Sequence, residues 1–196
     1  MKRSPTKMLC RAGIIAALYV VLTWPLGSLA FGTMGFQIRP AEALTMLPLF
    51  YPEAIPALYV GCLIANIITG NAWDIGLGSL CSLVAAALTF VTGKFIKNTP
   101  VKLVLGGVFP VLVNAFVIPL VLILGGSAYA GYWFMFASLA LTQSVWVYAL
   151  GVPLYFGIKA LRAKGISAFC DNVTGERLAK DESARSTQNR ADRAAK

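Results

Sequence analysis

Four charged side chains fall within one short stretch of an otherwise apolar chain. Residues 37–74 contain Arg39, Glu42, Glu53 and Asp74, and no other acidic residue precedes position 165. An ionisable side chain at the middle of a bilayer costs about 2.5–3.5 kcal/mol on insertion scales, so such residues usually face a cavity, a partner or the interface. We therefore expect the chemistry of this chain to lie in this stretch.

The composition is that of an integral membrane protein. The chain is 58% hydrophobic and 13% charged, with a mean hydropathy of +0.72. Its net charge of +9 arises from basic clusters that flank apolar runs, as the positive-inside rule expects, so we assign the charge to topology and not to nucleic acid. The chain has no histidine, which excludes Ser-His and Cys-His catalysis and histidine zinc sites.

The remaining motifs also argue against an enzyme. The four cysteines stand singly without CxxC spacing and are interpreted as packing residues, so we expect no metal site and no cofactor in this chain. The chain contains no GxxxxGK[ST] motif, so it cannot hydrolyse a nucleotide in the P-loop manner. A transport function would therefore need an energy-supplying partner.

Six apolar segments predict an all-α protein with six transmembrane helices. The segments are residues 12–29, 40–49, 54–69, 75–95, 101–124 and 132–159. Ten residues of α-helix rise only about 15 Å, so the second segment must be irregular or tilted among its neighbours. Pro110 and Pro119 predict a bend in the fifth helix, and Pro153 predicts an interruption of the sixth.

Basic residues predict that both termini are cytoplasmic. They cluster at positions 2, 3, 7 and 11, at 94, 97 and 102, and at 159, 162 and 164. A cleaved first segment would satisfy the later two clusters as well, but its apolar run is too long for a signal peptide, and we predict an uncleaved helix. Residues 1–164 are predicted to form one membrane substrate-binding domain, and 165–196 a polar, disordered cytoplasmic tail.

Each charged residue also has a structural interpretation. Glu42, in the first turn behind Pro40, would be stabilised by the helix dipole and could pair with Arg39, although its depth favours a binding role. Asp74 is placed where it could cap the fourth helix. Glu53 is interpreted as a solvated or capping acid in a cytoplasmic turn and is left out of the site.

Amides and aromatic residues extend the candidate site. Asn66, Asn114 and Gln143 lie within predicted spans, where an amide must find a hydrogen-bond partner in another helix or in a ligand. Trp73 and Trp146 are the two indole rings that could stack on a flat ligand. In the first helix, Ala12 and Ala16 lie one turn apart on a smooth face, which suits either internal packing or a partner helix.

Two motifs make the chain resemble a known family. Residues 39–48, RPAEALTMLP, and residues 74–80, DIGLGSL, are similar to motifs of the QueT family of substrate-binding S components of energy-coupling factor (ECF) transporters, and the resemblance covers about residues 8–160. It implies six helices around an outward pocket, with the first outer connection as a lid. It further implies docking of Ala12 and Ala16 on a transmembrane T component that works with two cytoplasmic ATPases.

The resemblance also implies a ligand, a queuosine precursor of the 7-deazaguanine class. A carboxylate such as Glu42 or Asp74 suits the adjacent N1–H and exocyclic amine of this base, and Arg39, Gln37 or Asn66 suits its O6. The complete predicted substrate-binding set is Gln37, Arg39, Glu42, Asn66, Asp74, Asn114, Gln143 and Trp146.

Other interpretations stay open. The chain could be an S component for a different vitamin-like heterocycle, or a ligand-free scaffold in which the charges are caps and the alanine face binds a partner. An intramembrane enzyme fits worst, because two separated carboxylates without histidine or metal ligands form no recognisable catalytic set.

Overall fold

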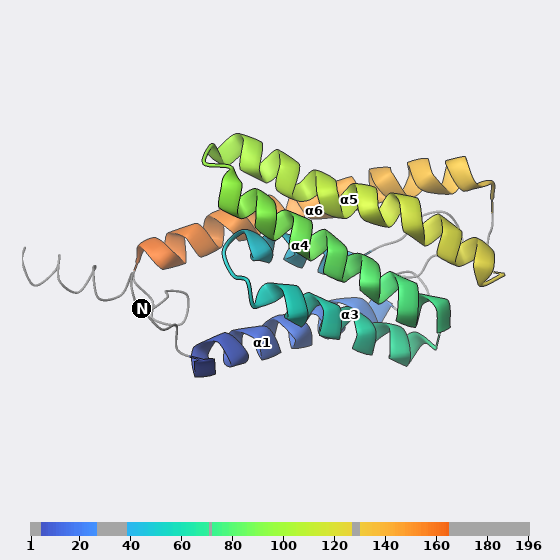
Figure 1. Ribbon diagram of the computed structural model, residues 1–196, viewed down its shortest axis with the longest axis horizontal. Helices are drawn as coiled ribbons and strands as arrows, with labels where there is room; N and C mark the ends of the chain where they lie inside the picture. The colour runs from blue at the N-terminus through green and yellow to red at the C-terminus, as the bar shows by residue number, and fades with distance from the viewer. Residues whose placement is uncertain (1–4, 27–38, 71, 127–129, 165–196) are drawn as a thin grey trace, which may run out of the picture.

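The computed structural model describes residues 5–26, 39–70, 72–126 and 130–164, and this part of the chain contains helices and turns but no strand. In chain order the elements are α1 (Pro5–Thr23), η1 (Trp24–Leu26), η2 (Pro40–Leu49), α3 (Ala54–Thr69), η3 (Asp74–Gly78), α4 (Ser79–Phe95), α5 (Thr99–Leu124) and α6 (Tyr132–Ala163). The long helices lie side by side in one elongated bundle (Figure 1).

Several of these helices can cross a membrane. Within the described residues, α1, the continuous η3–α4 helix, α5 and α6 are long and apolar enough to span it, and α3 is apolar but shorter. The predicted all-helical membrane architecture is therefore confirmed. The number of six spans and the cytoplasmic termini remain predictions, and the predicted tail at 165–196 lies outside the described residues.

The helices form an arc around η2. Helix α1 packs on α3, α3 on α4, α4 on α5, and α5 on α6, while η2 contacts all five of them. Residues 41–48 of η2 are all buried. Because a 3₁₀-helix rises about 2.0 Å per residue, this ten-residue segment reaches farther than an α-helix of the same length would. The irregular, protein-enclosed second segment expected from the sequence is thus confirmed.

Two expectations about helix boundaries were wrong. Helix α1 begins at Pro5 and ends at Thr23, so it includes the polar first turn that the predicted range of 12–29 left out. Helix α6 continues through Pro153 to Ala163 without the predicted interruption. Ending a helix inside a membrane would leave several backbone groups unpaired, whereas an internal proline removes the donor of only one hydrogen bond.

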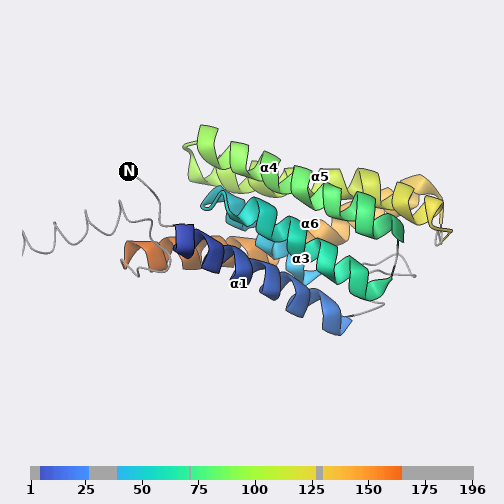
Figure 2. The ribbon, with the colours of Figure 1, turned by 60° about the horizontal axis from the view of Figure 1, so that its bottom comes forward.

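The basic clusters lie at one end of the bundle. Figures 1 and 2 show the N-terminal end of α1, the turn between α4 and α5, and the C-terminal end of α6 at the same end of the bundle. These ends carry the described basic residues Lys7, Arg11, Lys94, Lys97, Lys102, Lys159, Arg162 and Lys164. We call this end of the bundle the basic end, and it is the arrangement that the positive-inside rule predicts for a common side of the membrane.

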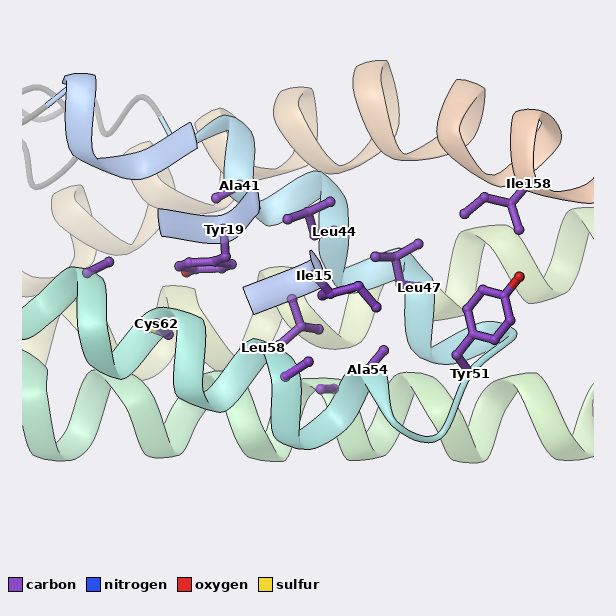
Figure 3. Packing of buried hydrophobic residues seen from close by; sticks show 13 residues of the cluster. Ile15, Tyr19, Ala41, Leu44, Leu47, Tyr51, Ala54, Leu58, Cys62 and Ile158 are labelled. Carbon is purple, nitrogen blue, oxygen red and sulfur yellow. The ribbon is translucent and has the colours of Figure 1, made fainter. Parts of the chain in front are cut away.

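The largest hydrophobic cluster fixes η2 against its neighbours. Figure 3 shows Leu44 and Leu47 of η2 close to Ile15 of α1, above Leu58 of α3. Each of these side chains is at most 6% exposed. The apolar face of η2 therefore positions the segment, and its polar residues are held at a fixed depth in the bundle.

Candidate functional site

Buried polar side chains from different helices form one set within the bundle. Its members come from every major element, and each is at most 5% exposed: Tyr19, Arg39, Glu42, Asn66, Asp74, Ser79, Asn114 and Gln143. We call this set the polar layer. Burying so many polar groups is costly unless each finds a hydrogen-bond or charge partner, so their partners reveal what the layer can do.

Glu42 is at the centre of the polar layer. It lies in the first turn of η2 and is 1% exposed. The hydroxyl of Tyr19 donates to its Oε1 at 3.4 Å, and Nδ2 of Asn114 donates to its Oε2 at 3.2 Å. Because a carboxylate has about four acceptor positions, each oxygen retains room for another donor. Glu42 therefore joins η2 to α1 and α5 and can still accept from a ligand.

Arg39 links the two acidic residues of the layer. Its guanidinium is 5% exposed and interacts electrostatically with both Glu42 and Asp74. A buried cation needs such compensation, because desolvation costs several kcal/mol per ion. With one guanidinium and two carboxylates, the ionised group carries a formal charge of −1, so it suits a ligand that presents cationic or hydrogen-bond-donating groups.

Asp74 and Asn66 are held together where η3 begins. The structure places Asp74 inside a helical run that already includes residues 72 and 73, and not at the capping position that the sequence allowed. Nδ2 of Asn66 donates to the backbone oxygen of Asp74 at 2.7 Å and to Oγ of Ser79 at 3.2 Å. The η3 segment is a π-helix, a distortion that is frequent at functional sites.

Gly78 explains why this corner of the site is so compact. A Cβ atom at this position would lie 3.0 Å from Oδ1 of Asp74 and 3.4 Å from Nδ2 of Asn66. A side chain here would force the carboxylate of Asp74 to shift by a few tenths of an ångström and would touch the amide of Asn66. Gly78, the second glycine of the DIGLGSL motif, thus allows the two polar side chains to lie this close to the helix backbone.

Gln143 has a different environment from the other amides. It is 0% exposed, and within the described part of the chain neither its Oε1 nor its Nε2 has a hydrogen-bond partner. An unsatisfied buried polar group costs about 1–3 kcal/mol. Gln143 is therefore the residue of the polar layer that most directly indicates a missing hydrogen-bonding group.

Two apolar clusters flank Gln143. On α6, Leu139 belongs to a cluster with Ile118 of α5, and Val147 belongs to another cluster with Val111 of α5. Gln143 lies between Leu139 and Val147, as Asn114 lies between Val111 and Ile118. The two amides thus occupy corresponding levels on neighbouring helices, separated from both ends of the bundle by apolar side chains.

The remaining predicted residues differ in their burial and in whether the structure describes them. Trp146 is partly buried on α6, close in sequence to Gln143, and its stacking role stays a prediction. Trp73 is 46% exposed and lies outside the polar layer, so the structure gives no support for a stacking role. Gln37 and the predicted lid lie outside the described residues.

The interpretation of Glu53 as a solvated or capping acid was wrong. Glu53 is 6% exposed and forms no side-chain cap hydrogen bond. Nε of Arg11 lies 3.1 Å from its Oε1, so the two residues form an ion pair at the basic end. Because Arg11 comes from α1 and is distant in sequence, no local pattern indicated this partner.

Sequence reasoning missed Tyr19, the residue that joins α1 to the polar layer. Ala12, Ala16 and Tyr19 follow the four- and three-residue spacing of one helix face. That face packs on α3, because a Cβ at Gly61 would lie 3.0 Å from the backbone oxygen of Ala16 and 2.8 Å from Cβ of Tyr19. Helical spacing from the alanine pair was therefore the signal that could have identified Tyr19.

Taken together, the helices and the polar layer define a polytopic α-helical membrane protein with a buried set of polar side chains. The chain belongs to the QueT transporter family, which matches residues 9–160. The family that the two motifs suggested is thus confirmed.

The chain is also similar to a protein named Queuosine precursor transporter QueT from Lactococcus lactis subsp. cremoris (strain MG1363). The two sequences are 35% identical over 88 residues, which cover 45% of this chain and 52% of the relative. The alignment therefore spans about half the length of that relative. No solved structure matches the chain.

Proposed function

We propose that this protein is the substrate-binding (S) component of an ECF-type importer and that it binds a queuosine precursor, a 7-deazaguanine such as preQ0, preQ1 or queuine. Membership of the QueT transporter family supports a transport function, and the name of the Lactococcus relative supports the ligand class. The absence of a P-loop motif from the sequence fits a subunit that obtains its energy from partner ATPases.

The observation that carries the proposal is the unpartnered amide of Gln143 in the polar layer. A side chain that is 0% exposed and retains both a donor and an acceptor is matched to a ligand that offers the same pair. The lactam edge of a 7-deazaguanine has an N–H beside a carbonyl oxygen and meets that requirement. Binding would then remove the unsatisfied group that the free protein contains.

The charges of the layer fit the other groups of the ligand. Glu42 has spare acceptor positions for the exocyclic amine, and Asp74 offers a second carboxylate close to Arg39. The formal charge of −1 on these three residues favours the cationic aminomethyl group of preQ1 over the neutral nitrile of preQ0. Asn66 and Asn114 donate to protein acceptors, so we assign them the role of orienting the layer.

Partners follow from the proposed class. The protein would dock on a T component with two ATPase subunits and deliver its ligand by toppling in the membrane, with six spans and both termini on the cytoplasmic side. Ala12 and Ala16 are the predicted docking residues, but the backbone of Ala16 approaches Gly61 of α3. Ala17 is a small residue on the exposed face of α1, and we add it to the docking face.

Two alternatives differ in what they say about the polar layer. An S component for another vitamin-like heterocycle would use the same residues with different edge chemistry. A ligand-free scaffold is favoured by the hydrogen bonds that Glu42 and Asn66 already make within the protein. The scaffold interpretation leaves Gln143 unexplained, and this is why we place it second.

The proposal is tested by calorimetric titration of the detergent-purified protein, without partners, with preQ0, preQ1 and queuine. Guanine, which has an imidazole ring in place of the pyrrole ring, tests whether the pyrrole ring is required. Riboflavin tests whether the protein binds heterocycles in general. We expect saturable one-to-one binding of a 7-deazaguanine, with preQ1 tighter than preQ0. Binding of riboflavin alone would favour the second S-component interpretation, and binding of none of the five would favour the scaffold.

A further inference from the structure

A lateral groove opens between the two edge helices of the bundle. Helix α1 packs on α3, α6 packs on α5, and η2 lies between the two edges. The resulting groove has a volume of about 510 Å³ and is lined by Ile14 and Leu18 of α1, and by Gly157 and Leu161 of α6. Ile14 is 61% exposed and Leu18 is 44% exposed, so the groove faces out of the bundle at the depth of the apolar spans.

The floor of the lateral groove is η2 itself. Leu44 and Leu47 line it, and the same two residues pack against Ile15 in the main hydrophobic cluster (Figure 3). Glu42 stands two residues before Leu44. Whatever fills the groove therefore presses on the segment that positions the polar layer.

Two guanidinium groups meet at the basic end of the groove. Arg11 lies with its Cζ 4.6 Å from the ring centroid of Tyr51, and Arg162 lies with its Cζ 5.5 Å from the same centroid. One comes from each wall of the groove, and Tyr51 and Arg11 are among its lining residues. Glu53 pairs with Arg11, and Arg162 brings a second guanidinium to the same end.

Three lysines add to the same charge. Lys159 lies on the C-terminal part of α6, Lys164 follows its last residue, and Lys7 lies one turn before Arg11 on α1. Among the described residues near this end, these three lysines join Arg11 and Arg162, and Glu53 is the one acidic side chain. Basic pockets between transmembrane helices suit anionic headgroups, and guanidinium groups bind phosphate oxygens through paired hydrogen bonds.

We infer that the lateral groove holds an acyl chain of an anionic phospholipid, with its phosphate at the Arg11–Arg162 end. The apolar lining matches a hydrocarbon chain, and its lateral opening at membrane depth gives lipid direct access. The charge at one end selects the headgroup and fixes the direction of the lipid. Because the acyl chain lies against Leu44 and Leu47, the bound lipid stabilises η2.

The experiment measures lipid retention and binding by native mass spectrometry of the full-length protein in detergent. Phosphatidylglycerol is titrated in parallel with phosphatidylcholine of identical acyl chains. Gly157→Leu fills the groove, and a Cβ at Gly157 meets no atom within 4 Å, so the substitution itself is tolerated. Gly13→Leu is the matched control, because Gly13 is an equally open helical glycine that does not line the groove.

The inference predicts that the wild-type protein prefers phosphatidylglycerol. Gly157→Leu should weaken the binding of phosphatidylglycerol about tenfold, the factor expected when two methylene groups of the acyl chain are no longer buried. Gly13→Leu should leave the binding of phosphatidylglycerol unchanged. Arg162→Gln should weaken it about fivefold, the contribution of one basic residue near an anionic surface, without affecting phosphatidylcholine. Phosphatidylglycerol should also raise the melting temperature of the wild-type protein more than that of Gly157→Leu.

Three results would overturn the inference. Equal binding of the two lipids would remove the headgroup assignment. Unchanged phosphatidylglycerol binding in Gly157→Leu would place the lipid elsewhere. A wild-type dimer that Gly157→Leu converts to a monomer would identify a second copy of the chain, and not a lipid, as the occupant. None of these readouts depends on the transported ligand, so the proposed function and this inference can fail separately.

Discussion

Replacing Gln143 with leucine should make the protein more stable and lower its affinity for the ligand. The wild-type amide is fully buried with no hydrogen-bond partner among the described residues, which costs about 1–3 kcal/mol. Leucine has a similar size and no polar atoms, and the flanking Leu139 and Val147 show that the neighbourhood accepts apolar side chains. We therefore expect Gln143→Leu to raise the melting temperature in detergent.

The same substitution should reduce affinity for the ligand. If the amide forms one donated and one accepted hydrogen bond with a 7-deazaguanine, losing both costs about 1–3 kcal/mol, or roughly 5- to 150-fold in Kd. Calorimetry measures the affinity, and a thermal shift assay on the same preparation measures the stability. The opposite signs of the two changes distinguish a ligand contact from a structural hydrogen bond.

Asn66→Leu provides the matched control. Asn66 is also a buried amide, but its Nδ2 donates to the backbone of Asp74 and to Ser79. Removing it leaves those acceptors without their donor, so this variant should lose stability. If Gln143→Leu loses as much stability as Asn66→Leu, the amide of Gln143 has a structural partner and our reasoning about it is refuted.

Three further substitutions test the surrounding structure. Glu42→Gln should weaken ligand binding about tenfold or more, because a hydrogen bond to a charged group contributes about 1.5–3 kcal/mol, and unchanged calorimetric affinity would contradict the assignment. Gly78→Ala should lower both the melting temperature and the affinity, because the new Cβ would lie 3.0 Å from Oδ1 of Asp74; a variant that melts like the wild type would show that the corner relaxes freely. Arg11→Ala should cost about 3–5 kcal/mol in stability by leaving the buried Glu53 carboxylate unpaired, and adding Glu53→Ala should recover part of that loss in the same thermal assay.

Most of the helices could be predicted from hydrophobic runs and prolines in the sequence. The predicted ranges 40–49 and 54–69 coincide with η2 and α3, because Pro40 marks the start of the first and Gly70 ends the second in a left-handed conformation. The start of α1 and the end of α6 were misplaced, since helices extend beyond their apolar cores into polar turns that hydropathy does not mark. The other end of α1 was placed too late, because the helix ends at Thr23, two residues before Pro25.

The polar layer was only partly predictable. Scarcity of charge identified Arg39, Glu42 and Asp74, and all three are buried in one group. Sequence reasoning could not show which polar groups satisfy one another, because the partners of Glu42 come from α1 and α5. Such pairings depend on how the helices pack, and no local spacing encodes that arrangement.

The lateral groove was not predictable at all. Its walls are α1 and α6, which are far apart in the sequence, and its floor is a 3₁₀-helix whose depth is fixed by packing. The sequence shows the basic residues at both chain ends, but only the structure brings Arg11 and Arg162 to one aromatic ring. Function at such a surface becomes visible only after the elements are assembled.

An experimental structure of the protein with preQ1 bound would test the proposed binding site most directly. We expect the ligand to lie within the polar layer, with Gln143 in hydrogen-bond contact with the lactam edge and Glu42 or Asp74 on the donor groups. A ligand bound outside the layer, with the amide of Gln143 hydrogen-bonded to protein groups, would contradict it.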